Sequence, residues 1–276
     1  MPALLPRFTI DQPSTLAEAS DLLRGFGDDG RAYAGGTELL LAMKYAGLRY
    51  GHLVDLKTIP GLDGIVEASE GLRIGALATH RGVERSPLVR ERFPALAQME
   101  ALVANPRVRA SGTLGGNLCF AEPHSDPATL LLCLDAQIAT SHRELPLSEF
   151  LIGPYEVALE EGELVQAVLI PWLPAGWRAH YRKVQFHERP MLGLALAIGD
   201  GQVRVATGSA CPTPRRSASA EALLAAGHVD DAADAQAEEA ELIDDFEGSA
   251  EYKRHLIHVE LGRAWEATVA SPVAAG

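Results

Sequence analysis

Two glycine pairs are the residues of this chain whose types and spacing point most directly to a chemistry. The first lies in residues 34–38 (AGGTE) and the second in residues 113–117 (TLGGN). Glycine has no Cβ, so backbone N–H groups in such segments can approach a bulky anion closely. Each pair follows a run that could form a strand, and we expect two loops that grip one diphosphate. This pattern indicates a dinucleotide cofactor, although glycine pairs also form plain turns.

Neither segment has the spacing of the common nucleotide fingerprints. The chain has no Gly-x-Gly-x-x-Gly at a strand–helix junction and no Gly-x-x-x-x-Gly-Lys-Ser/Thr, which argues against a Rossmann domain and a P-loop. In the first segment, Thr37 is placed to cap a helix that runs through Leu39 to Lys44. The positive end of that helix and the exposed N–H groups before it suit a phosphate.

Two further charged residues could contact such a cofactor. Asp126 lies ten residues past Gly116, and its carboxylate could accept hydrogen bonds from ribose hydroxyls. Because Asp126 precedes Pro127 and an apolar run, it could equally be a helix N-cap, and it would stay ionised in either role. Lys183 could place a positive charge beside the cofactor, or it could simply extend from a strand edge into solvent.

Other kinds of chemistry find little support. Residues 124–126 (HSD) are adjacent and cannot build a triad, whose members come from separate elements, and Gly-x-Ser-x-Gly is absent. Three isolated cysteines do not supply the four thiolates of an iron–sulfur cluster. Their odd number favours reduced thiols and a cytoplasmic protein.

The charge of the chain narrows the choice of partner. The net charge of −13 makes nucleic acids and anionic membranes poor partners. No run approaches the about 18 apolar residues of a membrane-spanning helix. An anionic cofactor would need local basic groups, and Arg107 and Arg109 could supply charge ahead of the second glycine pair or be solvated loop arginines.

The surrounding elements must position these residues. The 276 residues suggest about two domains, with a linker near Pro171, Pro174 and Gly176. Alternation and helical periodicity predict the following elements. Strands are expected at 31–34, 53–56, 72–76, 136–140, 144–147, 163–170, 178–184, 191–198 and 202–207, and helices at 15–25, 37–44, 81–103 with breaks near Pro87 and Pro94, 128–134, 217–226, 230–241 and 249–269.

Together these motifs resemble the FAD-binding (medium) subunit of the molybdenum hydroxylases, the family of xanthine dehydrogenase-type enzymes and aerobic carbon monoxide dehydrogenase. The two glycine segments resemble the family's two flavin loops, and Asp126 has the spacing of its flavin-binding aspartate. The resemblance extends through residues 163–165, Lys183, residues 205–216 and residues 248–252. Many members carry an aspartate between the lysine and the following strand, whereas residues 187–193 here read HERPMLG.

The resemblance implies an α+β fold. A PCMH-type FAD-binding domain over residues 1–174 would comprise a small α/β subdomain (about 1–57) and a mixed-sheet subdomain (58–174). A C-terminal domain over 175–276 would hold a small antiparallel sheet and helices. The implied FAD-binding residues are Ala32, Tyr33, Ala34, Gly35, Gly36, Thr37, Glu38, Leu39, Thr113, Gly115, Gly116, Asn117, Asp126, Val165 and Lys183.

The resemblance also implies a function with partners. The chain would take electrons from the [2Fe–2S] clusters of a small subunit and pass them through FAD to NAD, oxygen or a quinone. A large subunit would carry molybdopterin, and the assembly would be a dimer of heterotrimers. Two alternatives stay open, a self-sufficient FAD-dependent oxidoreductase and a non-catalytic FAD-binding assembly module. No catalytic residue and no metal site are expected in this chain.

Overall fold

The computed structural model describes residues 4–187 and 189–270. Its N-terminal unit, residues 4–58, is a three-stranded parallel sheet in the order β1-β3-β2 with two α-helices. Helix α1 starts where the Thr15 hydroxyl accepts a hydrogen bond from the Glu18 N–H, the N-cap bond of a Thr-x-x-Glu sequence. The elements are β1 (Thr9–Asp11), α1 (Leu16–Phe26), η1 (Gly27–Asp29), β2 (Gly30–Tyr33), α2 (Leu39–Tyr45), β3 (His52–Asp55) and η2 (Leu56–Thr58).

The central unit, residues 65–171, pairs an antiparallel sheet with a group of short helices. The sheet order is β4-β5-β10-β6-β7, and its apolar face packs with these helices into the largest core of the molecule. Its strands are β4 (Ile65–Ala68), β5 (Gly71–Gly75), β6 (Gln137–Thr140), β7 (Glu144–Pro146) and β10 (Val165–Pro171), with a separate pair β8 (Leu151–Gly153) and β9 (Glu156–Val157). Its helices are α3 (His80–Arg85), α4 (Pro87–Arg92), α5 (Pro94–Leu102), α6 (Pro106–Ser111), α7 (Leu114–Phe120), α8 (Asp126–Cys133) and α9 (Leu147–Phe150).

The C-terminal unit, residues 178–270, is an antiparallel sheet in the order β11-β12-β13-β14, covered on one face by three helices. Strand β12 is buried on both faces because its residues alternate: Leu194 and Leu196 join the helices, whereas Ala195 and Ala197 join the central core. The elements are β11 (Arg178–Val184), β12 (Leu192–Gly199), β13 (Gln202–Gly208), β14 (Arg215–Arg216), α10 (Ala218–Ala225), α11 (Val229–Glu239) and α12 (Ala250–Ala270).

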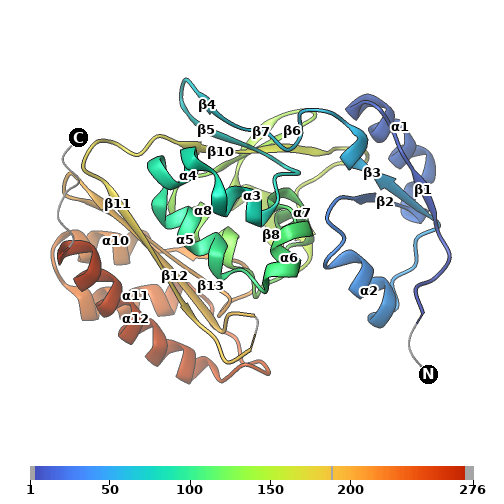
Figure 1. Ribbon diagram of the computed structural model, residues 1–276. Helices are drawn as coiled ribbons and strands as arrows, with labels where there is room; N and C mark the ends of the chain where they lie inside the picture. The colour runs from blue at the N-terminus through green and yellow to red at the C-terminus, as the bar shows by residue number, and fades with distance from the viewer. Residues whose placement is uncertain (1–3, 188, 271–276) are drawn as a thin grey trace.

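The three units lie side by side (Figure 1). The N-terminal unit is at the right, the central helices lie in front of their sheet, and the C-terminal sheet runs diagonally toward helices α10–α12 at the lower left. Small residues bring that sheet close to α8: a Cβ on Gly208 would lie 2.0 Å from Thr129 Oγ1. The central unit is therefore enclosed between the other two.

The expected fold class is confirmed, with one correction. The second sheet is antiparallel at each of its pairings, not mixed, because its strands are joined by hairpins and returning helices rather than by parallel crossovers. Within the described residues, no helix is long and apolar enough to cross a membrane.

Candidate functional site

A cavity of about 760 Å³ lies between the N-terminal and central units, within the size range of ligand pockets. Both glycine segments contribute to its wall, and so do residues at the end of β9 and the start of β10. Residues Arg189 and Pro190, which connect β11 to β12, complete the wall from the C-terminal unit. Residues from all three units therefore meet at one cavity.

The first glycine segment presents unpaired backbone donors to this cavity. Strand β2 ends at Tyr33, and Gly35, Gly36, Thr37 and Glu38 all line the cavity. Within the described residues, no acceptor is found for the backbone N–H groups of these four residues. Buried or cavity-facing N–H groups without partners are costly, so four in succession indicate an anionic ligand.

The shape of this segment depends on its two glycines. Gly36 adopts φ +71°, and a Cβ there would lie 2.6 Å from the Tyr33 ring. A Cβ on Gly35 would lie 2.2 Å from the Ser111 carbonyl oxygen, because the two backbones touch at this point. The Ser111 hydroxyl also donates a hydrogen bond to the Gly35 carbonyl, at 2.9 Å. Glycine is therefore required for the contact between units as well as for the turn.

The prediction that Thr37 caps the next helix is wrong. The N-cap of α2 is Glu38, which makes no side-chain capping bond. Because Thr37 precedes the N-cap, its hydroxyl stays at the cavity wall, next to Gly112. No side chain caps α2, and the Leu40 N–H donates to the Gly36 carbonyl at 3.1 Å.

The second glycine pair lies in a helix, which corrects the expectation of a loop after a strand. It is preceded by α6 and forms the first turn of α7, with the Thr113 hydroxyl accepting from the Gly116 N–H at 3.1 Å. The Gly115 N–H donates to the Ala76 carbonyl at 2.9 Å, and a Cβ on Gly115 would lie 2.6 Å from the Ala76 Cβ. Gly115 therefore serves close packing, and its N–H group is not available to a ligand.

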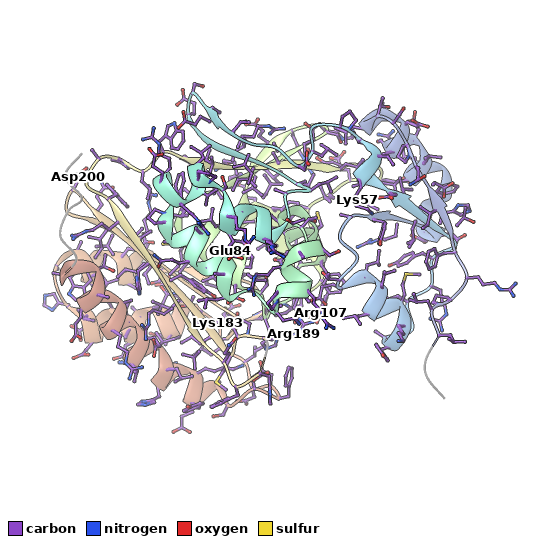
Figure 2. All side chains as sticks on the ribbon, viewed as in Figure 1. Lys57, Glu84, Arg107, Lys183, Arg189 and Asp200 are labelled. Carbon is purple, nitrogen blue, oxygen red and sulfur yellow. The ribbon has the colours of Figure 1, made fainter. Side chains whose placement is uncertain are left out.

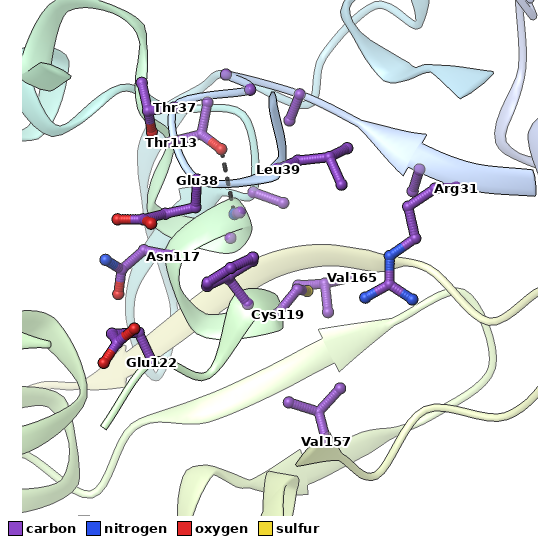
Figure 3. A pocket seen from close by; sticks show the side chains of 18 of the residues that line it. Arg31, Thr37, Glu38, Leu39, Thr113, Asn117, Cys119, Glu122, Val157 and Val165 are labelled. Atoms are coloured by element: carbon purple, nitrogen blue, oxygen red, sulfur yellow. Dashed lines mark hydrogen bonds between the residues drawn. The ribbon is translucent and has the colours of Figure 1, made fainter. Parts of the chain in front are cut away.

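The second segment offers the cavity polar side chains rather than free backbone N–H groups. The Asn117 Oδ1 accepts from the Ser125 hydroxyl at 2.7 Å, which leaves the amide NH₂ of Asn117 as a donor. The Thr113 hydroxyl proton is likewise available, since its oxygen is the acceptor in the capping bond. Figure 3 shows Glu38, Asn117 and Glu122 on one side of the pocket and Arg31 on the other.

Asp126 and Lys183 form a buried ion pair at the edge of the site. The Lys183 Nζ is 2.8 Å from Asp126 Oδ2, and the Tyr181 hydroxyl donates to Oδ1 at 2.8 Å. Burial raises the pKa of Asp126, while the charge of Lys183 and these hydrogen bonds act in the opposite direction. Asp126 is the first residue of α8 and not its N-cap, which is Ser125. Lys183 does not extend into solvent, because its side chain is 4% exposed.

Most of the residues expected at the site line the cavity. They are Ala32, Ala34, Gly35, Gly36, Thr37, Glu38, Leu39, Thr113, Gly115, Gly116, Asn117, Asp126 and Val165. Two do not: Tyr33 lies behind Gly36 under the Lys57 ammonium, and Lys183 reaches the cavity wall only through Asp126. Arg107 and Arg109 are on α6 and do not line the cavity, and Arg109 pairs with Glu84 instead.

Sequence reasoning missed several residues of the wall. Arg31 stands one residue before the expected segment, over the Tyr50 ring, and within the described residues no carboxylate pairs with it. His80 reaches the cavity from α3 with its Nδ1 2.7 Å from the buried Glu100. The spacing of apolar residues predicts which elements form, but it does not show which of their polar side chains reach a cavity.

The adjacent residues 124–126 do not form a hydrolytic triad. Glu122 and Asp245 occupy the two His124 nitrogens, at 3.2 and 3.0 Å, while the Ser125 hydroxyl is turned to Asn117. Burial raises the pKa of the nearby Cys119 to about 12, which favours the protonated thiol over the thiolate. The cavity offers hydrogen-bond donors and carboxylates for binding rather than an activated nucleophile.

Two family models match the chain. Residues 6–173 match the FAD binding domain in molybdopterin dehydrogenase, and residues 198–268 match the CO dehydrogenase flavoprotein C-terminal domain. The chain belongs to this FAD-binding family. The expected family resemblance is thereby confirmed.

Among curated proteins, this flavoprotein resembles medium chains of oxidoreductases. It is 31% identical to the carbon monoxide dehydrogenase medium chain of Hydrogenophaga pseudoflava, over 94% of this chain and 98% of that one. It is 29% identical to the nicotine 6-hydroxylase medium subunit of Paenarthrobacter nicotinovorans, over 92% and 94%.

Solved structures agree with this assignment. The flavoprotein matches carbon monoxide dehydrogenase from Hydrogenophaga pseudoflava with a TM-score of 0.92 at 32% identity, covering 97% of this chain and 99% of that one. It matches quinoline 2-oxidoreductase from Pseudomonas putida 86 with a TM-score of 0.88 at 25% identity, covering 96% and 98%. It is thus an FAD-binding medium subunit of the molybdenum hydroxylase type, related to subunits of oxidoreductases.

Proposed function

We propose that the cavity between the N-terminal and central units holds FAD, with the diphosphate on the first glycine segment. The observation that carries this proposal is a run of four cavity-lining residues, 35–38, whose backbone N–H groups have no acceptor among the described residues. A diphosphate satisfies several such donors at once, and Gly36 at φ +71° places a sharp backbone turn within the run.

The remaining polar groups have distinct tasks in this proposal. The Asn117 amide and the Thr113 hydroxyl donate to the same ligand from the second glycine segment, and Arg31 supplies a positive charge that no carboxylate of the described residues neutralises. Asp126 accepts from ribose hydroxyls, and Lys183 keeps that carboxylate ionised and oriented from behind. Gly115 allows the close packing of α7 against Ala76.

Bound FAD supplies electron transfer in one- and two-electron steps, chemistry that no side chain of this cavity provides. We propose that electrons arrive from the [2Fe–2S] clusters of a small partner subunit and leave to NAD, oxygen or a quinone. A large partner subunit would carry molybdopterin, in a dimer of heterotrimers. The support is the similarity over nearly the whole chain to medium chains of carbon monoxide dehydrogenase and nicotine 6-hydroxylase.

The domain division remains part of the proposal. Residues 1–174 would form the FAD-binding domain, with subdomains of about 1–57 and 58–174, and residues 175–276 would form the C-terminal domain. The separate apolar cores of the N-terminal and C-terminal units support this division. The central core extends into β11–β13, so the boundary near residue 174 separates elements that pack together.

The test is cofactor content followed by reduction. The full chain, incubated with FAD and desalted, should release one FAD per chain on denaturation. Partner polypeptides that co-purify with the chain should contain iron and molybdenum, and rapid mixing with the reduced partners should bleach the flavin absorbance. A chain that takes up no FAD refutes the proposal, and a flavin that partners never reduce refutes its electron-transfer part.

A further inference from the structure

A cluster of charged side chains joins the two glycine segments to the C-terminal unit. Arg189 lies in the connection between β11 and β12, and its Nη2 is 3.0 Å from Glu38 Oε2. Its Nη1 is 2.7 Å from Glu122 Oε2. Glu38 is the last residue of the first glycine segment, and Glu122 lies just beyond the end of α7. One guanidinium therefore bridges a carboxylate downstream of each glycine pair.

The Glu122 end of this bridge is firmly held. Its carboxylate also accepts from the Tyr155 hydroxyl at 2.7 Å and contacts His124 Nδ1 at 3.2 Å. Burial alone would raise the pKa of Glu122, but the bonds from His124 and Tyr155 and the charge of Arg189 outweigh it and hold the pKa at about 2. His124 connects onward to Asp245 of the C-terminal unit, at 3.0 Å. The carboxylate is therefore a fixed negative charge.

Both carboxylates stand at the wall of the cavity that would receive the diphosphate. Glu38, Glu122 and Arg189 all line it, and Glu38 is itself one of the four residues with a free backbone N–H. A diphosphate bound there would be repelled by two nearby carboxylates if nothing neutralised them. The whole chain carries a net charge of −13, which adds to that repulsion.

We propose that Arg189 is a positioning residue for the cofactor, neutralising Glu38 and Glu122 and holding the two glycine segments at one spacing. This inference rests on the proposed function. Each terminal nitrogen of Arg189 contacts one of the two carboxylates, and the inference is that Arg189 acts through them and not by touching the diphosphate. Figure 2 places Arg189 below the central helices, near Lys183 in that view, where the C-terminal unit meets the other two.

The experiment compares FAD affinity with the stability of the FAD-free chain. Affinity is read from the quenching of flavin fluorescence on the full chain, and stability from urea unfolding without FAD. Arg189→Gln should raise the dissociation constant about tenfold or more at an ionic strength of about 20 mM. At about 500 mM the dissociation constant of the variant should lie closer to that of the unsubstituted chain, because salt screens the two unpaired carboxylates. The matched control is Arg92→Gln, which removes a half-exposed arginine that bridges Glu67 and Glu91 away from the cavity.

A second background separates neutralisation from direct contact. In the chain carrying Glu38→Gln and Glu122→Gln, no carboxylate needs Arg189, so adding Arg189→Gln should change the dissociation constant by less than about twofold. A loss that persists there means that Arg189 contacts the ligand itself and overturns the inference. Equal FAD affinity of Arg189→Gln and the unsubstituted chain overturns it as well. If the unsubstituted chain takes up no FAD at all, the proposed function fails first and this inference falls with it.

Discussion

Replacing Gly35 by Ala probes the contact between the two units that enclose the cavity. The new Cβ would lie 2.2 Å from the Ser111 carbonyl oxygen and 2.8 Å from the Gly112 Cα, and both neighbours are backbone atoms. Ordinary contact begins near 3.4 Å, so the two segments must separate by about 1.2 Å. A flexible side chain could yield at such a distance, but these atoms belong to the end of α6 and the turn into α7.

Gly35→Ala should lower both the free energy of unfolding and the affinity for FAD. Overpacking of this kind lowers the free energy of unfolding by about 1–3 kcal/mol. The same shift breaks the 2.9 Å bond between the Ser111 hydroxyl and the Gly35 carbonyl, and it moves the free N–H groups away from α7. A binding site displaced by about 1 Å is no longer organised for its ligand, so FAD affinity should fall by about 100-fold.

The assay is FAD titration by fluorescence quenching together with urea unfolding of the FAD-free chain. The control is Gly25→Ala, a helical glycine in the same unit with nothing within 4 Å of its added Cβ. That change should leave FAD affinity unaltered and raise the free energy of unfolding by about 0.5–1 kcal/mol. Unchanged FAD affinity in Gly35→Ala would refute the reasoning that the close backbone contact shapes the site.

Three further predictions concern single residues. Lys183→Met should lower the free energy of unfolding by about 3–5 kcal/mol at pH 7, because Asp126 loses its ammonium partner. Burial raises the folded-state pKa of Asp126 above its usual value, and loss of the ammonium removes an opposing effect. The folded variant therefore neutralises its buried carboxylate by taking up a proton as the pH falls through that raised pKa, and urea unfolding should show a smaller loss of stability at pH 4 than at pH 7. Thr113→Ala removes the cap of α7 and should lower the free energy of unfolding by about 1 kcal/mol, measured the same way. Gly36→Val places a β-branched residue at φ +71° against Tyr33, and the purified variant should contain no FAD after desalting.

Local signals in the sequence were enough to find the main elements. The capping motif at Thr15 and Glu18 predicts α1, and alternation predicts β11, β12 and β13 close to their observed bounds. These signals succeed because a capping motif and a periodic pattern of apolar residues can both be read from residues that are close in sequence. The first glycine segment was found for the same reason, since a strand, a glycine pair and a helix follow one another directly.

The second glycine segment shows where local reasoning fails. Gly115 packs against Ala76, about forty residues earlier in the chain, and nothing in the local sequence distinguishes a packing glycine from a ligand-binding one. Asp126 was expected to act alone or as a cap, but the sheet brings Lys183 and Tyr181 to it. Arg189 bridges Glu38 and Glu122 across three units. Such contacts depend on tertiary packing, which periodicity does not encode.

Hydrogen exchange of the backbone N–H groups of residues 35–38 is the most direct test of the claim that they hold the diphosphate. Within the described residues these groups have no acceptor, so they should exchange rapidly in the FAD-free chain. Saturation with FAD should slow their exchange by about 100-fold or more, while the N–H group of Gly115, already bonded to Ala76, should change little. Rapid exchange at residues 35–38 in a chain with FAD fully bound would contradict the account.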